Sequence, residues 1–222
     1  MSSLNYTTLR EQVASILRKR ILDGTIQPGE KIKETEVSKE FSISRGPVRE
    51  ALRQIEQEGL VYYEPNKGCT VKTLTYGNIN EVYLIRATLE ALAVQIFDGK
   101  FREDSITKLQ EAVNELGRAA EQKNLFEIVT WDEVFHELIV KEAESSRLLD
   151  TWKMFEGENA AVYYTMNRNE LMPVEHLKRN HQRILDICKS QDTDAICNTI
   201  KRHYMIVPED LRKKEQGNCT KE

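Results

Sequence analysis

The stretch Ser44-Arg45-Gly46-Pro47-Val48-Arg49-Glu50-Ala51-Leu52 decides the fold of the first third of this chain. A serine followed by a proline within one turn is typical of a helix N-terminus. Three apolar residues recur at helical spacing and predict a buried face: Val48, Leu52 and Ile55. Arg45 and Arg49 lie one turn apart on another face, which suits the major groove of double-stranded DNA. A solvated basic face is the alternative for this helix taken by itself.

The residues before this helix predict a helix-turn-helix. A helical pattern runs from 7 to 23 and ends at Gly24, and a short one covers about 34–41. Only three residues join the short helix to the quoted one, which is the spacing of a helix-turn-helix. An ordinary corner between two helices has the same spacing.

The residues after the quoted helix predict a wing. Residues 60–64 and 69–73 are rich in β-branched and aromatic side chains, and the turn-forming segment 65–68 separates them, so a β-hairpin is expected. Lys67 and Gly68 at its tip suit phosphate contact or entry into the minor groove. Taken alone, the pair is also compatible with an ordinary exposed turn. We therefore expect residues 1–74 to form a winged helix-turn-helix domain.

Four segments of this domain together resemble the GntR family of bacterial transcription regulators. They are residues 21–30, 44–52, 58–61 and 66–68. The resemblance implies that Arg45 and Arg49 contact bases or phosphates, with Lys67 and Gly68 at the wing. The family usually has a threonine where this chain has Gly46, so a hydroxyl expected near the DNA backbone is missing.

Composition limits the class of protein. Of the 222 residues, 40% are hydrophobic and 31% charged, and no apolar run approaches the roughly 18 residues that cross a bilayer. The first residues lack the pattern of a signal peptide, and the four cysteines show no close pairing, so a cytoplasmic protein with reduced thiols is expected. Residues 1–74 hold 12 Lys and Arg against 10 Asp and Glu, although the whole chain has a net charge of −4. The first domain is thus the better partner for phosphate.

Residues 75–222 predict an all-α antiparallel bundle of six helices. The helices are expected near 78–98, 102–121, 124–143, 146–168, 174–190 and 192–215. The linker 74–78 contains Gly77, which we expect to act as a hinge. The fold class is therefore mostly α, with a small β-hairpin in the first domain.

Four ionisable residues fall on helix faces that are otherwise apolar: Asp132, His136, His181 and His203. Burying a lone carboxylate costs several kcal/mol unless another group compensates it. One carboxylate and three imidazoles suit Zn, Ni, Co, Mn or Fe and leave positions open for a ligand. Each histidine taken singly is compatible with an ordinary core residue. His176 lies about 140° around its helix from His181 and is excluded from the set.

Three segments of the second domain resemble the FCD domain of the FadR-like branch of the same family. They are residues 86–90, 132–136 and 180–185, joined by the downstream His203. The short bundle looks like the VanR-type subgroup. The resemblance implies a metal at Asp132, His136, His181 and His203, with a small carboxylate effector nearby. Asn180, where a glutamate is common, and residues 145–146, where Gly-Asn is common, depart from the pattern without touching a proposed ligand.

Arg86 is the expected anchor of that effector. It falls on an expected buried stripe of the first bundle helix, formed by Val82, Leu89, Ala93 and Ile96. Because a guanidinium keeps its charge, it needs an anionic partner there. Glu90, one turn along, is the alternative partner.

Together these features predict a cytoplasmic, homodimeric transcription regulator, expected to be a repressor. Two winged helices would read an inverted-repeat operator, and the bundles would sense a small organic acid beside a divalent transition metal, zinc being expected in the purified protein. A metalloenzyme is the alternative from another class. It is disfavoured because no inward glutamate is evident as a general base. In a third interpretation the metal is purely structural or is itself the signal.

Overall fold

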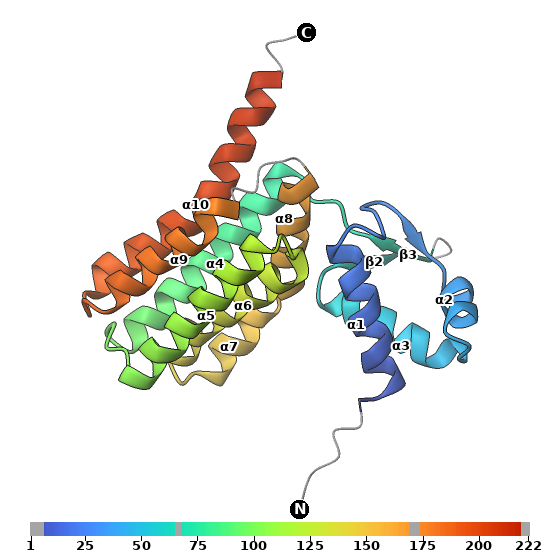
Figure 1. Ribbon diagram of the computed structural model, residues 1–222, viewed down its shortest axis with the longest axis horizontal. Coiled ribbons are helices and arrows are strands. Elements are labelled where there is room, and N and C mark those ends of the chain that lie inside the picture. Colours follow the sequence, from blue (N-terminus) through green and yellow to red (C-terminus); the bar gives the residue numbers. More distant parts are fainter. Residues whose placement is uncertain (1–6, 65–67, 169–173, 219–222) are drawn as a thin grey trace, which may run out of the picture. The chain divides into compact units, whose positions relative to one another are not determined.

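The computed structural model describes residues 7–64, 68–168 and 174–218. The chain divides into two compact units, Met1–Thr73 and Leu74–Glu222 (Figure 1). Leu74 packs against the core of the second unit, so the division falls directly before it.

The first unit is a winged helix, as predicted. Its elements are α1 (Leu9–Leu22), β1 (Lys31–Ile32), α2 (Glu34–Glu40), α3 (Arg45–Gln57), β2 (Val61–Glu64) and β3 (Gly68–Val71). The three strands form an antiparallel sheet in the order β1-β3-β2, in which Val61 pairs with Val71. The pattern predicted the hairpin but missed β1, because two residues are too few to show an alternation.

Local sequence explains where these helices begin and end. Thr8 caps α1 and forms a reciprocal capping box with Glu11. Gly24 follows the helix with a φ of +79°, which glycine adopts without strain. The inward face of α3 is confirmed: Val48, Leu52 and Ile55 are each fully buried.

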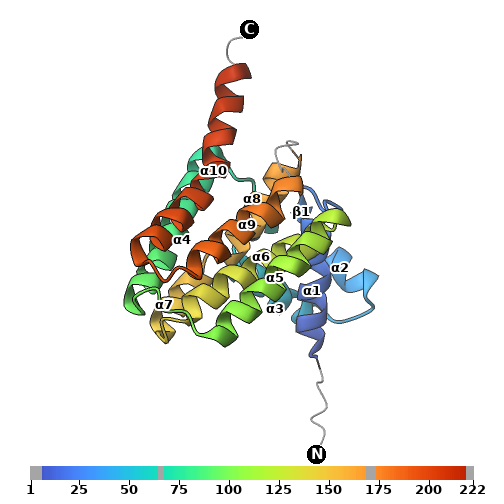
Figure 2. The ribbon, with the colours of Figure 1, turned by 60° about the vertical axis from the view of Figure 1, so that its left-hand side comes forward.

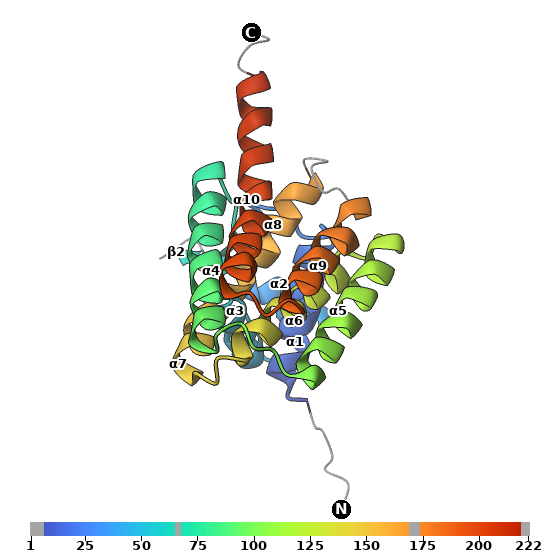
Figure 3. The ribbon, with the colours of Figure 1, turned by 90° about the vertical axis from the view of Figure 1, so that its left-hand side faces the viewer.

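The second unit consists of helices throughout its described residues. They are α4 (Tyr76–Ile96), α5 (Glu103–Glu121), α6 (Leu125–Lys141), α7 (Ser146–Lys153), α8 (Glu156–Arg168), α9 (Val174–Cys188) and α10 (Thr193–Asn218). Figures 2 and 3 show α10 lying along α4, with α9 between α10 and α5. None of the described helices is both long enough and apolar enough to cross a membrane.

The single helix predicted over 146–168 is in fact two helices. The chain turns at Met154, the C-cap of α7, and α8 starts at Glu156. The turn lets Trp152 pack in a separate cluster with Ala93 and Val140, while α8 approaches α6. No proline marks the break, but Gly157 in the first turn of α8 is a helix-weakening residue that could have indicated it.

The expectation that Gly77 is a linker hinge is wrong. Gly77 lies in the first turn of α4, behind a capping box in which Thr75 and Asn78 bond each other. A second correction concerns the far end of the same helix, where Ile96 is 52% exposed instead of buried.

Candidate functional site

The four predicted ligands come together in the bundle core. Asp132 and His136 lie on α6, His181 on α9 and His203 on α10. One ligand atom from each of the four lies within 4.8 Å of the others. Helices distant in sequence thus converge on a volume of the size that one ion occupies.

Asp132 is only 3% exposed and is held by donors from neighbouring helices. Tyr163 Oη donates to Oδ1 at 2.5 Å, and Asn159 Nδ2 donates to Oδ2 at 3.0 Å. Burial opposes ionisation, but the hydrogen bond with His181 and the nearby imidazoles hold the pKa of Asp132 well below its usual range. The carboxylate therefore stays charged although it is almost fully buried.

Two of the histidines are oriented by groups outside the cluster. His181 Nδ1 donates to the backbone carbonyl of Leu177 at 2.9 Å, which leaves its Nε2 facing Asp132 at 2.9 Å. His136 Nδ1 lies 2.9 Å from a carboxylate oxygen of Glu90. A carboxylate or carbonyl on the outer nitrogen is the usual arrangement of a metal-bound histidine.

His203 supplies the clearest sign that the cluster is incomplete. Its Nδ1 is buried and has no hydrogen-bond partner in the described parts of the chain. Burial and the neighbouring imidazole of His181 lower the pKa of His203 well below its usual value. A neutral imidazole is the form that binds a metal.

Around the cluster, carboxylate groups outnumber guanidinium groups. Three carboxylates, Glu90, Asp132 and Glu133, lie in this core with one guanidinium, Arg86. Burial raises the pKa of Glu133 to about 7, against the lowering effect of Arg86. One carboxylate and three imidazoles that converge within the reach of a single ion form a donor set that fits a divalent transition metal.

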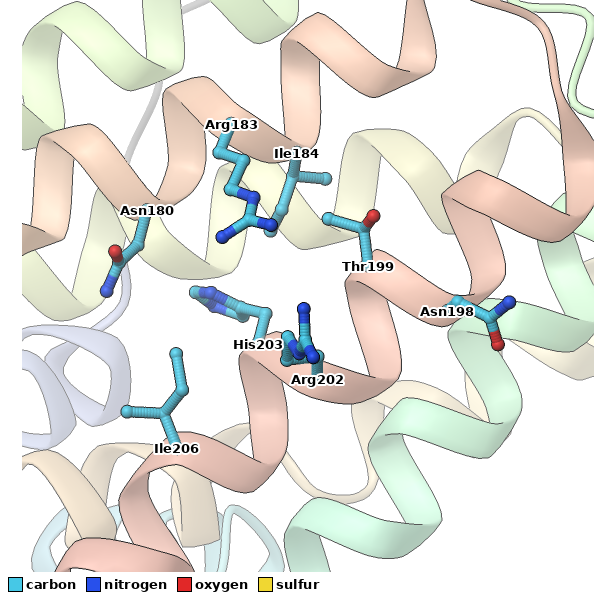
Figure 4. Close-up of a pocket in the computed structure, with 8 residues that line it drawn as sticks. All are labelled: Asn180, Arg183, Ile184, Asn198, Thr199, Arg202, His203 and Ile206. Atoms are coloured by element: carbon cyan, nitrogen blue, oxygen red, sulfur yellow. The ribbon is translucent and has the colours of Figure 1, made fainter.

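Two adjoining cavities border the cluster. An inner one of about 50 Å³ is lined by groups that include Asp132, His136 and Tyr163. An outer one of about 310 Å³ lies between α9 and α10 (Figure 4). Asn180, His203 and Ile206 line both cavities, so a small molecule in the outer space could reach the cluster.

Arg86 is fully buried, as expected, but its partner was not foreseen. Its Nη2 lies 3.0 Å from Glu133 Oε2, and its guanidinium lies 4.2 Å from the ring centroid of Trp152. Glu90, the partner considered from sequence, bonds His136 and Tyr204 instead. Because Glu133 already balances the guanidinium, an effector is not needed to do so, and the effector role of Arg86 stays a prediction.

Sequence reasoning did not place the groups that surround the predicted ligands beside them. These are Glu90, Glu133, Asn159 and Tyr163. The sequence showed no inward glutamate as a general base; an inward glutamate does lie beside the cluster, because Glu90 is fully buried and bonds the ring of His136. The spacing of Glu90 one turn from the inward Arg86 was the available signal.

Three of the residues predicted to contact DNA lie together at the start of α3. Arg45, Gly46 and Arg49 are all exposed. Arg49 Nη2 pairs with Glu34 Oε2 of α2 at 3.0 Å, and the same carboxylate accepts the Tyr63 hydroxyl at 2.8 Å. Arg49 is thus held by Glu34, although 56% of its side chain remains exposed.

Two of the residues predicted to contact DNA, Gly46 and Gly68, are glycines. A Cβ at Gly46 would meet only Ser44 Oγ, at 4.0 Å, so the threonine usual in the family would fit there. Gly68 begins β3 with a φ of +88° and open space around it. Lys67 lies outside the described residues.

Comparison with known proteins decides the family. Residues 9–71 match the bacterial regulatory proteins of the gntR family, and residues 81–205 match the FCD domain. The HTH-type transcriptional regulator YdhC of Bacillus subtilis is 31% identical over 191 residues, which cover 85% of this chain and 84% of that protein. The chain belongs to the GntR family. It is a transcriptional regulator with an FCD domain, and the relatives are not enzymes.

Two further likenesses extend this result. The gluconate operon transcriptional repressor of Bacillus subtilis is 30% identical over 197 residues, covering 87% of this chain and 81% of the repressor. The crystal structure of a GntR regulator from Rhodococcus sp. RHA1 superposes with a TM-score of 0.78 at 25% identity, covering 93% of this chain and 99% of that one. The two-domain architecture of this GntR protein is therefore shared over nearly its whole length.

Arg86→Ala should destabilise the GntR protein by about 3–5 kcal/mol, because it leaves Glu133 buried without its cation. Urea unfolding followed by circular dichroism measures the loss. Arg118→Ala is the matched control: that guanidinium is 67% exposed, and its removal should cost less than about 1 kcal/mol. Equal stability of the two variants would show that the Arg86–Glu133 pair contributes nothing.

Proposed function

We propose that this GntR regulator is a homodimeric, cytoplasmic repressor whose operator affinity is set by a small organic acid bound beside a metal. The observation that carries the proposal is the buried cluster of Asp132, His136, His181 and His203, with its orphaned imidazole nitrogen. Such a cluster is costly in a helical core unless an ion occupies it.

The metal would be a divalent transition ion, with zinc expected in the purified protein. Asp132 and the three imidazoles would bind it, while Glu90 and the Leu177 carbonyl would orient two of the rings. Four protein ligands leave room for one or two further donors on Ni, Co, Mn or Fe, and for an expanded shell on Zn. The ion would supply a positive centre that attracts a carboxylate.

The effector would enter through the paired cavities. A carboxylate is small enough for the inner space, and the outer space holds the rest of a small molecule. The relative that represses a gluconate operon supports an organic acid, because gluconate is a carboxylic acid. Binding would favour one arrangement of the helices over another and so change operator affinity.

The winged helix would read one half-site in each protomer. Arg45 and Arg49 at the start of α3 would reach base edges or phosphates in the major groove, and Gly68 would bring the wing backbone close to DNA. Two copies in a homodimer would then match an inverted repeat.

The dimer surface would be the outer face of α4. Leu84 is 55% exposed, Leu92 43% and Ile96 52%, and successive turns of one helix bring them onto one side. Three large apolar side chains in one row are rarely left in water on a monomer.

Arg49→Ala should weaken operator binding by ~1–3 kcal/mol per half-site and relax base preference, because a bidentate base contact is lost. Fluorescence anisotropy with operator and scrambled duplexes at several salt concentrations measures both effects. Arg45→Ala should instead weaken all sequences evenly and flatten the salt dependence if its contact is to phosphate. Arg118→Ala, with the same charge change in the second unit, should leave binding unaltered. Operator affinity of the Arg49 variant within about twofold of wild type would remove Arg49 from the interface.

His181→Ala should abolish metal binding, whereas the protein as purified should carry about one transition metal per chain. Removing the ion leaves buried negative charge uncompensated, so chelation should lower the Tm by roughly 5–10 °C. Elemental analysis and thermal scans test both points. His176→Ala, at an exposed position on the same helix, should keep the metal and the Tm. Absence of metal together with no thermal shift on adding Zn or Ni would contradict the site.

Titration of the protein with metal and with organic acids, while operator affinity is measured, distinguishes the possible roles of the metal. Operator affinity that changes with an organic acid only when metal is present supports the proposed control. A response to the metal alone would make the ion the signal, and no response to either would leave it purely structural.

Leu84→Glu combined with Leu92→Glu should convert the dimer to monomers, because two charges would be buried in an apolar interface. Sedimentation velocity at micromolar concentration reports the species. Leu9→Glu changes an equally exposed leucine of the first unit, 52% exposed, and should keep the dimer. A dimer that survives the double change would place the interface elsewhere.

A further inference from the structure

Two arginines in the outer cavity have no role in the site as described so far. Arg183 extends from α9 and Arg202 from α10, and both line the space in front of His203 (Figure 4). They approach from opposite walls of the same cavity, so a molecule held there would meet both guanidinium groups.

Neither guanidinium is balanced by the protein. Among the residues that the structure describes, no carboxylate pairs with Arg183 or Arg202, and no hydrogen bond to either side chain is formed. Other exposed arginines of the described chain, such as Arg147 and Arg212, are unpaired as well, so it is the shared cavity that sets Arg183 and Arg202 apart. Two like charges facing one cavity repel each other, and an anion placed between them removes that repulsion.

The shapes of the two cavities restrict how a ligand can lie. The inner space of about 50 Å³ holds little more than one carboxylate, so the rest of any effector must extend into the outer 310 Å³. If one carboxylate of a molecule lies at the cluster beside His203, the other end of that molecule therefore lies in the outer cavity, near Arg183 and Arg202.

The wall between these two ends is mixed, with amide and hydroxyl groups beside the apolar side chains of Ile184 and Ile206. Asn180 and Asn198 line the outer cavity without a side-chain hydrogen bond in the described structure. Thr199 Oγ1 donates to the Ala195 carbonyl and keeps its acceptor capacity. Amide and hydroxyl groups in this position suit the hydroxyl groups of a polyol chain.

We propose that the effector is a hydroxylated acid with two anionic ends. One carboxylate lies beside the cluster of Asp132, His136, His181 and His203, and the second anionic group lies between Arg183 and Arg202. This inference rests on the proposed metal-dependent acid site and adds the second charge. The second group is a carboxylate, as in an aldaric acid, or a phosphate, as in a phosphorylated aldonic acid.

The test compares acids that differ only in the second charge. Calorimetry on the metal-loaded full chain would use three matched pairs: D-gluconate and D-glucarate, D-galactonate and galactarate, L-threonate and L-tartrate. In at least one pair the diacid should bind about tenfold or more tightly than the monoacid. In the double variant Arg183→Gln with Arg202→Gln that preference should vanish, while monoacid affinity stays within about twofold. A 6-phosphogluconate arm identifies phosphate as the second group if it binds more tightly than D-glucarate and loses its advantage in the same variant.

The control removes two positive charges elsewhere. Arg147 on α7 and Arg212 on α10 are exposed and lie outside both cavities, so Arg147→Gln with Arg212→Gln should retain the diacid preference. One outcome would overturn the second-charge inference and leave the proposed function standing. In that outcome a monoacid binds only when His181 is present, and neither a diacid nor a phosphorylated acid binds more tightly than the monoacid. A preference that survives loss of both cavity arginines would also overturn it. Failure of every acid to bind would overturn both.

Discussion

A buried, charged carboxylate sits at the centre of the helical unit, and the hydrogen bonds that stabilise it constrain the packing of that unit. Asp132 receives hydrogen bonds from Tyr163 and Asn159 of α8 and faces His181 of α9. Loss of any of these donors would leave part of the desolvation cost of several kcal/mol unmet. The relative positions of α6, α8 and α9 are therefore fixed more tightly than apolar packing alone would require.

The same network reaches the helix that leads to the first unit. Glu90 on α4 bonds His136 of α6 and the hydroxyl of Tyr204 on α10, so α4 shares the central cluster without supplying a ligand to it. Four residues, 72–75, connect the end of β3 to the start of α4, and Leu74 among them already packs on the bundle core. The connection between the two units is thus short, and Leu74 within it is already held by the bundle. No flexible glycine linker intervenes, because Gly77 is helical.

The sequence predicted what periodicity and local chemistry report. The apolar stripes that contain Asp132 and His181 are buried as expected, and α3 has the expected inward face. Periodicity does not report partners that are distant in the chain. It therefore could not predict that Glu133 pairs with Arg86 or that Asn159 donates to Asp132. The break at Met154 was missed although Gly157, in the first turn of α8, was a local signal for it; the packing of Trp152 against α4 and α6 is a long-range contact that the pattern does not report.

The arginines show why burial is a poor guide to ligand sites. Arg86 was the expected anchor because it lies on a buried stripe, yet a buried cation must be neutralised for the protein to fold, and Glu133 does so. An exposed cation can remain unpaired because water solvates it. Arg183 and Arg202 satisfy that condition, and they also line a cavity that borders the cluster. Their unpaired guanidinium groups are available to a ligand, whereas Arg86 is already paired with Glu133 and only its buried Nη1 is without a partner among the described residues.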